Sequence, residues 1–388
     1  MGFYIASDED IRAGKVTDVY FRRVIAALEK RGINPVVNME VRAGGLPGDW
    51  RWAVFAGLEE VLELVDGLPV ELRSIDEGTL FSADEPVLSI KGRYLDFAVY
   101  ETALLGLICQ ASGIATTSAR CRLAAGERTV ISFGARRMHP AIAPMIERNA
   151  YLGGCDGVAV VQSAELIGLK PSGTMAHSLI LCAGDEKIAL EAFEESLEPG
   201  VPLIALIDTF QDEKFGALFA AEVLGDRLSG VRLDTPGSRR GDFKKIMQEV
   251  RWELDVRGFG DVKLFVSGNL DEYNILEYNG VADAYGVGTH ISNSPVVNFS
   301  ADIVEVDGEL RSKRGKKAGL KQLWTCSECD FRSVTLADVE LASCPAGGEL
   351  MEPLIKDQYA DGRRLRAARS ISEMRASVVE SLGSVELD

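Results

Sequence analysis

The sequence predicts an α/β protein with three parts: an N-terminal α+β domain, an irregular TIM-like α/β barrel, and a small C-terminal cysteine-containing subdomain. Three observations support this fold. Apolar runs between residues 128 and 289 each end in polar or glycine residues, and amphipathic helical patterns separate them. Strand-like runs with few crossovers precede this region, and short strands with clustered cysteines follow it. Strands that alternate with helices form a parallel sheet, and its ligand site lies at the carboxyl ends of the strands.

Length and composition indicate an ordinary globular protein of more than one domain. The 388 residues are too many for one small core. The formal charge of −17 argues against nucleic acid or an anionic membrane as a partner, because both need a basic field. No apolar run approaches the ~18 residues of a membrane span. The seven cysteines, mostly scattered in apolar runs, indicate reduced thiols and a cytoplasmic location.

The N-terminal α+β domain is expected to cover residues 1–114. Its few crossovers between strands distinguish it from the barrel. The expected elements are helices at about 18–32, 52–64 and 94–113 and strands at 35–41, 70–73, 79–81 and 86–90.

The barrel is expected to cover residues 115–294. Its strand-like runs lie at 128–134, 157–161, 203–209, 229–233, 263–269 and 284–289. Six or seven strands fall short of the eight in a regular barrel, so we expect an irregular or incomplete one. Residues 295–388 are expected to return to the N-terminal domain and to include a zinc-knuckle-like piece at about 322–356.

Glycine and acidic residues end several of the predicted strands. Gly286, Gly288 and Thr289 offer backbone N–H groups and a hydroxyl with little side-chain bulk, which suits a phosphate. Asp208 and Asp234 could bind a ribose diol or a hydrated Mg²⁺, because that ion prefers hard oxygen ligands.

Basic residues also lie near the ends of strands in the same region. Arg136 and Arg232 could each bind a carboxylate or a phosphate through two hydrogen bonds. The alternative for every one of these charges is a surface ion pair. Because they all finish apolar strands on what would be one rim, we expect a shared site for an anionic ligand.

Histidine is rare in this chain, with three residues in all. His177 follows Gly173 and Thr174 in a loop between strands, where it could act as a nucleophile toward a ligand. His139 is a weaker candidate, and His290 could orient the phosphate-binding turn that it follows.

Five segments together resemble the nicotinate phosphoribosyltransferases, a branch of the type II phosphoribosyltransferases found in archaea and many bacteria. These segments are 85–92, 133–137, 173–177, 231–236 and 285–289, and the resemblance extends over nearly the whole chain. It implies that nicotinate and phosphoribosyl pyrophosphate react, with Mg²⁺, to give nicotinate mononucleotide and pyrophosphate in NAD salvage. It also implies ATP as a co-substrate whose hydrolysis is coupled to synthesis, as in a ligase.

The resemblance implies a role for each matched residue. Tyr20 and Phe133 would enclose the pyridine ring, with Tyr20 coming from the neighbouring subunit of a homodimer. Arg232 would hold the pyridine side and Asp234 the ribose, and His177 would be transiently phosphorylated. The 5′-phosphate would lie against Gly268, Asn269, Gly288 and Thr289 with Arg136 adding charge, and the expected substrate-binding set also includes Arg137, Asp208 and Ser267.

The C-terminal cysteines depart from the pattern of relatives that carry a zinc knuckle. Cys326, Cys329 and Cys344 are in place, but Gly347 stands where a fourth thiolate would be. A structural zinc ion normally has four protein ligands, so the sequence leaves zinc binding open.

Three alternatives remain. Quinolinate phosphoribosyltransferase makes the same product with loss of CO₂, and should show extra basic residues for a second carboxylate and no loop like 173–177. Nicotinamide phosphoribosyltransferase differs only in its acceptor, and the sequence separates acid from amide poorly. A non-catalytic protein that binds nucleic acid through a cysteine ribbon is disfavoured by the acidic charge and the missing fourth cysteine.

Overall fold

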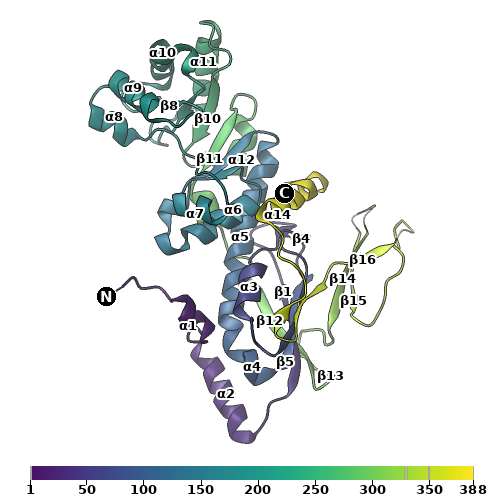
Figure 1. Cartoon of the computed structure of the whole chain (residues 1–388). Coiled ribbons are helices and arrows are strands. Elements are labelled where there is room, and N and C mark those ends of the chain that lie inside the picture. The colour runs from purple at the N-terminus through teal and green to yellow at the C-terminus, as the bar shows by residue number, and fades with distance from the viewer. Residues whose placement is uncertain (1, 327, 330, 348–349, 388) are drawn as a thin grey trace. The chain divides into compact units, whose positions relative to one another are not determined.

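The computed structural model describes residues 2–326, 328–329, 331–347 and 350–387 (Figure 1). They form two compact units. The first contains the chain up to Thr116 together with residues 295–383, and the second contains residues 117–294 with the short piece 384–387.

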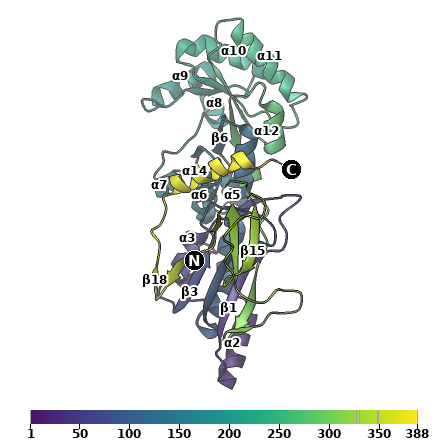
Figure 2. The same ribbon diagram turned by 90° about the vertical axis from the view of Figure 1, so that its right-hand side faces the viewer.

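The first unit is built on a seven-stranded antiparallel sheet, part of which is labelled in Figure 2. In order across the sheet, the strands are β13 (Glu309–Leu310), β12 (Phe299–Val306), β1 (Val36–Ala43), β5 (Pro86–Arg93), β3 (Val70–Ser74), β17 (Lys356–Ala360) and β18 (Arg363–Arg364). The C-terminal segment adds strands at both edges of this sheet, because β12 pairs with β1 and β17 pairs with β3.

Helices and two smaller sheets complete the first unit. The helices are α1 (Asp8–Arg12), α2 (Val19–Arg31), α3 (Leu58–Leu64), α4 (Tyr94–Phe97), the first part of α5 (Glu101–Ala125) and α14 (Ile371–Ser381). The smaller sheets are β2 (Ala53–Val54) with β4 (Leu80–Phe81), and β15 (Arg332–Leu336), β14 (Lys321–Cys326) and β16 (Met351–Pro353). In the core, Leu104 and Ile108 of α5 are buried together with sheet residues such as Val41 and Leu88.

Two predicted helices differ from the structure at their ends. The helix expected from residue 52 begins only at Leu58, because Ala53 and Val54 pair with β4 as a strand. The helix expected to end near Gly113 continues to Ala125. Gly113 has a packing role instead, because a Cβ atom there would collide with the carbonyl oxygen of Pro295.

The stretch Tyr94–Ala125 is long and apolar enough to cross a membrane, although no such run was expected from the sequence. Half of its most apolar window is buried inside the protein. Burial of Ile108, Ser112 and Thr116 shows that its composition fits a core helix.

The second unit contains a parallel six-stranded sheet. In order across the sheet, its strands are β7 (Gly157–Val158), β6 (Thr129–Ser132), β11 (Ala284–Val287), β10 (Lys263–Ser267), β9 (Gly230–Leu233) and β8 (Ile204–Leu206). The edge strands β7 and β8 are not paired with each other, so the sheet is open and a closed barrel is not observed. Its helices are α6 (Ala143–Leu152), α7 (Val161–Leu166), α8 (His177–Ala183), α9 (Glu186–Ser196), α10 (Glu213–Leu224), α11 (Phe243–Asp255), α12 (Glu272–Tyr278) and α13 (Thr289–Ser292).

Strand β7 is shorter than the predicted run 157–161. The buried carboxylate of Glu147 accepts the backbone N–H groups of Ala159 and Val160 at 3.0 and 2.9 Å. The strand therefore stops after Val158, and helix α7 begins at Val161.

Candidate functional site

One pocket lies at the carboxyl ends of strands β6, β9, β10 and β11. Its lining residues are Phe133, Arg136, Arg137, Arg232, Asp234, Ser267, Gly268, Asn269, Gly286, Gly288 and Thr289. All except Gly286 belong to the catalytic or substrate-binding set expected from the sequence. Side chains that are far apart in the chain therefore meet at one edge of the parallel sheet, where α/β proteins bind ligands.

Two glycines of this region allow close approaches that a side chain would prevent. A Cβ atom on Gly286 would collide with the ring of Phe133, and a Cβ atom on Gly134 would collide with the carbonyl oxygen of Gly288. Any larger residue at either position would push the ring or the turn out of place.

Arg232 is held by groups on both sides of its guanidinium. Its Nη2 lies 3.0 Å from Oδ2 of Asp234, its Nε donates to Oγ of Ser267 at 2.9 Å, and its Nη1 donates to Oγ1 of Thr174 at 2.8 Å. Ser267 in turn donates to Oδ1 of Asp234 at 2.7 Å. A guanidinium fixed in this way presents its charge in one orientation, which favours recognition of a planar anion.

The pocket also offers an aromatic face. The ring of Phe133 stacks on Phe265 with centroids 5.8 Å apart, and Cζ of Arg232 lies 5.6 Å from the Phe133 centroid. An aromatic ring beside a guanidinium suits a ligand that is itself a planar ring carrying negative charge.

Arg136 and Arg137 supply further positive charge. Both belong to a short 3-10 turn after β6 and are exposed. Neither forms an ion pair within the part of the chain that the structure describes, so their guanidinium groups can serve a ligand.

Two turns supply backbone groups for an anion. Gly268 and Asn269 follow β10 with φ of 84° and 49°, and Gly288 and Thr289 follow β11. Backbone N–H groups of such glycine-containing turns can bind a phosphate, and we name these two segments the anion-binding turns for that expected role.

Arg240 supports the first of these turns and was not singled out from the sequence. Its guanidinium donates to the carbonyl oxygens of Thr235 at 2.7 Å, Ser267 at 2.9 Å and Gly268. It also lies 4.4 Å over the ring of Phe243. The sequence showed only two adjacent arginines in a polar loop, so nothing distinguished Arg240 from its exposed neighbour Arg239.

Asp208, Asp234 and His177 form an adjoining group. Nε2 of His177 lies 3.6 Å from Oδ2 of Asp234 and 3.9 Å from Oδ1 of Asp208, and its Nδ1 lies 2.9 Å from Oγ1 of Thr209. The side chain of Asp208 is buried and accepts the backbone N–H of Asp234 at 2.7 Å. Burial raises the pKa of Asp208, and the nearby carboxylate of Asp234 acts in the same direction, while hydrogen bonding and His177 oppose the shift.

The two carboxylates of this group could hold a hydrated Mg²⁺. Oδ1 of Asp208 is buried and has no hydrogen-bond partner among the residues that the structure describes. An unsatisfied carboxylate oxygen costs free energy unless a cation or a proton reaches it. Asp234 lines the pocket and supplies the second carboxylate.

Tyr20 does not line this pocket. It belongs to the first unit, on helix α2, where its side chain is exposed and its ring contacts that of Phe21 with centroids 4.2 Å apart. Its expected role in enclosing the pyridine ring therefore depends on a contact between this helix and residues 117–294, which carry the pocket.

A larger cavity of about 600 Å³ lies at the opposite, amino-terminal ends of the strands. It shares Phe133 with the pocket and is lined largely by apolar and glycine residues, with Lys170, Lys263 and Asp283 as its charged side chains. We place the functional site in the smaller pocket, because the arginines, the aspartate and the anion-binding turns converge there.

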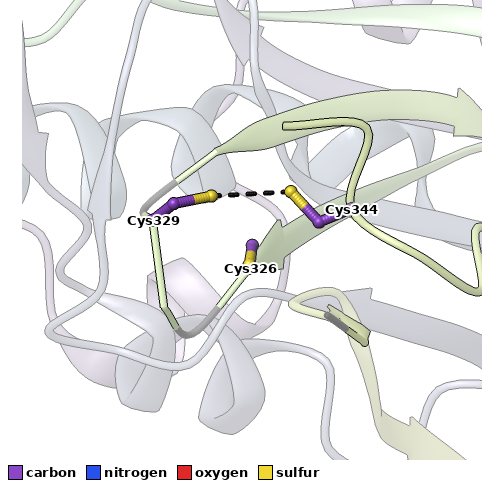
Figure 3. Close-up of side chains that lie close together, drawn as sticks. All are labelled: Cys326, Cys329 and Cys344. Carbon is purple, nitrogen blue, oxygen red and sulfur yellow. Dashed lines mark hydrogen bonds between the residues drawn. The ribbon is translucent and has the colours of Figure 1, made fainter. Parts of the chain in front are cut away.

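The three C-terminal cysteines also converge (Figure 3). Cys326 ends β14, and the Sγ atoms of Cys329 and Cys344 lie 3.5 Å apart. All three sulfur atoms lie within 4.8 Å of one another. A Cβ atom on Gly347 would lie 4.0 Å from Sγ of Cys329, so position 347 borders this cluster.

Comparison with known families identifies the chain. A parallel α/β unit with arginines, aspartates and glycine-containing turns around one pocket is typical of proteins that bind phosphorylated ligands. The family description "Quinolinate phosphoribosyl transferase, N-terminal domain" matches residues 18–112, and its C-terminal domain matches residues 114–302. The chain therefore belongs to the family of quinolinate and nicotinate phosphoribosyltransferases.

Individual relatives agree with this family. The crystal structure of nicotinate-nucleotide pyrophosphorylase from Pyrococcus furiosus is 49% identical, covers all of both chains and has a TM-score of 0.98. Nicotinate phosphoribosyltransferase pncB1 of Mycobacterium tuberculosis is 30% identical over 79% of this chain and 76% of its own length. Human nicotinic acid phosphoribosyltransferase, 22% identical with a TM-score of 0.73 over 95% of this chain and 94% of its own, shares the fold.

These findings confirm the resemblance but correct the expected activity. Relatives named nicotinate phosphoribosyltransferase do match over most of the chain. The main assignment, nicotinate phosphoribosyltransferase coupled to ATP hydrolysis, is nevertheless overturned, because both matching family descriptions are those of quinolinate phosphoribosyl transferase. The 49%-identical structure is described as nicotinate-nucleotide pyrophosphorylase, which points the same way.

Proposed function

We propose that this protein is a phosphoribosyltransferase of NAD biosynthesis that converts quinolinate and phosphoribosyl pyrophosphate to nicotinate mononucleotide, pyrophosphate and CO₂. The observation that carries the proposal is the single pocket in which Arg136, Arg137, Arg232 and Asp234 meet two anion-binding turns. The family descriptions and the Pyrococcus furiosus structure support the quinolinate branch.

The charge of the pocket suits two anionic reactants. Quinolinate has two carboxylates, and phosphoribosyl pyrophosphate has phosphates at both ends. Arg232 is fixed beside the ring of Phe133, where it would orient the acceptor, while the exposed Arg136 and Arg137 can adapt to further negative charge. The turns at Gly268 and Gly288 would bind the 5′-phosphate.

The reaction needs positioning more than a general base. The pyridine nitrogen already has the lone pair that attacks C1 of the ribose, and the transition state develops oxocarbenium character. Asp234, held by Arg232 and Ser267, would orient the ribose and stabilise this positive charge. A Mg²⁺ ion held by Asp208 and Asp234 would neutralise the departing pyrophosphate.

Loss of CO₂ follows formation of the bond to ribose. The C2 carboxylate leaves as CO₂, the electron pair of the broken C–C bond remains on C2 beside the positively charged nitrogen, and a proton from solvent then binds to C2. The arginines would have to hold the ring in place during this step without neutralising the carboxylate that leaves.

The loop 173–177 was expected to distinguish nicotinate enzymes from quinolinate enzymes. In this chain Thr174 Oγ1 and the carbonyl oxygen of Met175 accept hydrogen bonds from Nη1 of Arg232 at 2.8 and 3.3 Å. We propose that the loop orients Arg232 and that His177 orients the adjoining carboxylates, roles that serve either acceptor.

The acceptor can be tested directly. Purified protein is supplied with phosphoribosyl pyrophosphate and Mg²⁺, with quinolinate, nicotinate or nicotinamide in turn, and the release of pyrophosphate and CO₂ is measured. We expect turnover with quinolinate, with one CO₂ released for each pyrophosphate. Turnover of nicotinate without turnover of quinolinate would overturn the proposal.

We also propose that the open sheet is an incomplete TIM-like barrel, which agrees with a phosphate site after its last strands.

A homodimer in the cytoplasm is proposed as the working form. Helix α2 supports a dimer, because Val19, Tyr20 and Val24 leave an exposed apolar surface on it.

The cysteine cluster is proposed to bind zinc with a fourth ligand that is not a protein thiolate. Tetrahedral zinc with Zn–S bonds of about 2.3 Å places its sulfur ligands roughly 3.8 Å apart. The 3.5 Å between the sulfur atoms of Cys329 and Cys344 is close to that spacing, and Cys326 completes three ligands.

A further inference from the structure

A buried network lies behind the two anion-binding turns. Glu272 is the first residue of α12, three positions after Asn269 of the first turn. His290 lies in α13, directly after Thr289 of the second turn. One pair of side chains therefore connects the segments that follow β10 and β11.

The contacts within this network are short. Oε2 of Glu272 lies 2.6 Å from Nε2 of His290, and Oε1 of Glu272 accepts a hydrogen bond from Nε of Arg120 at 2.8 Å. Arg120 belongs to α5, and Nη2 of the same guanidinium also reaches the hydroxyl of Tyr273 at 3.3 Å. Both turns are thus tied through one carboxylate to a third element of the second unit.

The surroundings of this carboxylate favour its ionised form. Burial by itself would raise the pKa of Glu272, but hydrogen bonds from His290, Arg120 and the backbone outweigh that effect and lower the pKa to about 2. The side chains of Arg120 and Glu272 are 1% and 5% exposed. A buried charge that loses its partner is strongly unfavourable, so the network strongly favours one arrangement of the three residues.

The thiol of Cys121 lies close to the same two groups, within 4.8 Å of Glu272 and His290. Burial raises its pKa well above the usual value, so it stays protonated and acts as a packing neighbour. Neither Glu272 nor His290 lines the pocket itself.

We propose that Glu272 is a positioning residue for phosphate binding, which acts through His290 and Arg120 to hold the turns at Gly268–Asn269 and Gly288–Thr289 at the correct separation. The inference rests on the proposed function, because it needs a phosphorylated substrate at those turns. It assigns no chemical step to Glu272 or His290.

Two variants of His290 separate positioning from folding. His290→Phe removes the ring nitrogen that meets Glu272 and leaves the buried pair of Arg120 and Glu272 intact. His290→Gln keeps a side-chain N–H that can donate to the same oxygen. Tyr273→Phe is the matched control, because it removes a second contact of Arg120 without touching the link between the turns.

The experiment measures the Kd of phosphoribosyl pyrophosphate by calorimetry without an acceptor, and then KM and kcat for each substrate. In His290→Phe and in Glu272→Gln we expect Kd and KM for phosphoribosyl pyrophosphate to rise about 10-fold, with kcat and the acceptor KM nearly unchanged. His290→Gln should recover most of the loss, and Tyr273→Phe should bind like the wild-type protein.

The outcomes separate this inference from the proposed function. If the wild-type protein does not bind phosphoribosyl pyrophosphate, the proposed function and the inference both fail. If the wild-type protein binds it and both His290→Phe and Glu272→Gln bind it equally well, only the positioning role is overturned. Thermal unfolding of each variant shows whether a loss reflects an unfolded protein, and an effect of His290→Phe in a fully folded variant supports the proposal.

Discussion

At the residue scale, Arg232 is the side chain on which recognition of the acceptor depends. Four protein groups fix its guanidinium, and the ring of Phe133 lies beside it. A lysine at this position would keep the charge but would lose the planar set of donors.

We therefore expect Arg232→Lys to lower kcat/KM for the acceptor about 100-fold, in line with the loss of one or two hydrogen bonds to charged groups. KM for phosphoribosyl pyrophosphate should change much less, since its phosphates bind at the turns. Steady-state kinetics with each substrate varied in turn would measure both effects. Arg239→Lys, an exposed arginine in the loop after β9, is the control and should leave both constants unaltered.

Glu272 also makes a pH-dependent contribution to stability. Its pKa falls from 4.5 to about 2 on folding, so the stabilisation is present above pH 4.5 and is lost as the pH falls toward 2. A shift of this size corresponds to about 3 kcal/mol.

Glu272→Gln removes that titration. The difference in unfolding free energy between the wild-type protein and this variant should be largest near neutral pH and should shrink as the pH falls below 4.5. Urea unfolding between pH 7 and pH 3 would show it. Glu277→Gln, on the exposed face of the same helix, should give a small difference at every pH; a constant difference for Glu272→Gln would count against the ionised carboxylate.

Single residues also show which parts of the site the sequence could predict. Phe133, Arg232 and Asp234 stand at the ends of apolar strands, and a parallel sheet brings such ends together whatever the details of packing. Arg240 and Glu272 act through contacts with segments distant in the chain, and their own neighbours in sequence give no sign of this.

At the scale of elements, the strands of the second unit were predictable but several ends were not. The run 157–161 is apolar throughout, yet the carboxylate of Glu147 removes two of its N–H groups from the sheet. Gly113 resembled a helix end, and only its contact with Pro295 shows why a glycine is required inside α5. In both places a contact from elsewhere in the chain overrides the local pattern.

The three-stranded sheet offers a test of the proposed zinc site. Position 347 borders the cysteine cluster, so Gly347→Cys would supply the fourth thiolate of a tetrahedral site. We expect this variant to retain zinc in the presence of a chelator at a concentration about 10-fold higher than the wild-type protein tolerates.

The effect is measured as the zinc content of each purified variant, determined by elemental mass spectrometry. Cys344→Ser should lose zinc, while Cys182→Ser, which changes an exposed cysteine of the second unit, should bind as much as the wild-type protein. Absence of zinc from both the wild-type protein and Gly347→Cys after expression with added zinc would disprove the site.

At the scale of the whole molecule, the chain passes from the first unit to the second and back. The pocket belongs entirely to residues 117–294, while the aromatic side chain expected to cover the acceptor, Tyr20, belongs to the other unit. Sequence patterns locate strands and their ends, but they carry little information about which surfaces of separate units or subunits meet. The way in which the units and subunits assemble therefore does not follow from sequence patterns.

Hybrid dimers test the proposed assembly. If Tyr20 of one subunit completes the pocket of the other, Tyr20→Ala inactivates the pocket of the partner subunit and Arg232→Ala inactivates the pocket of its own subunit. A dimer of one Tyr20→Ala subunit and one Arg232→Ala subunit then has one pocket with both changes and one pocket with neither. Random exchange makes half of the dimers mixed, so a 1:1 mixture should recover about a quarter of the wild-type activity. Activity measured before and after exchange, with mass spectrometry to show mixed dimers, decides the matter. Mixed dimers that form without recovered activity would mean that Tyr20 does not act across the interface, because a pocket completed within one subunit leaves every site damaged by one of the two changes.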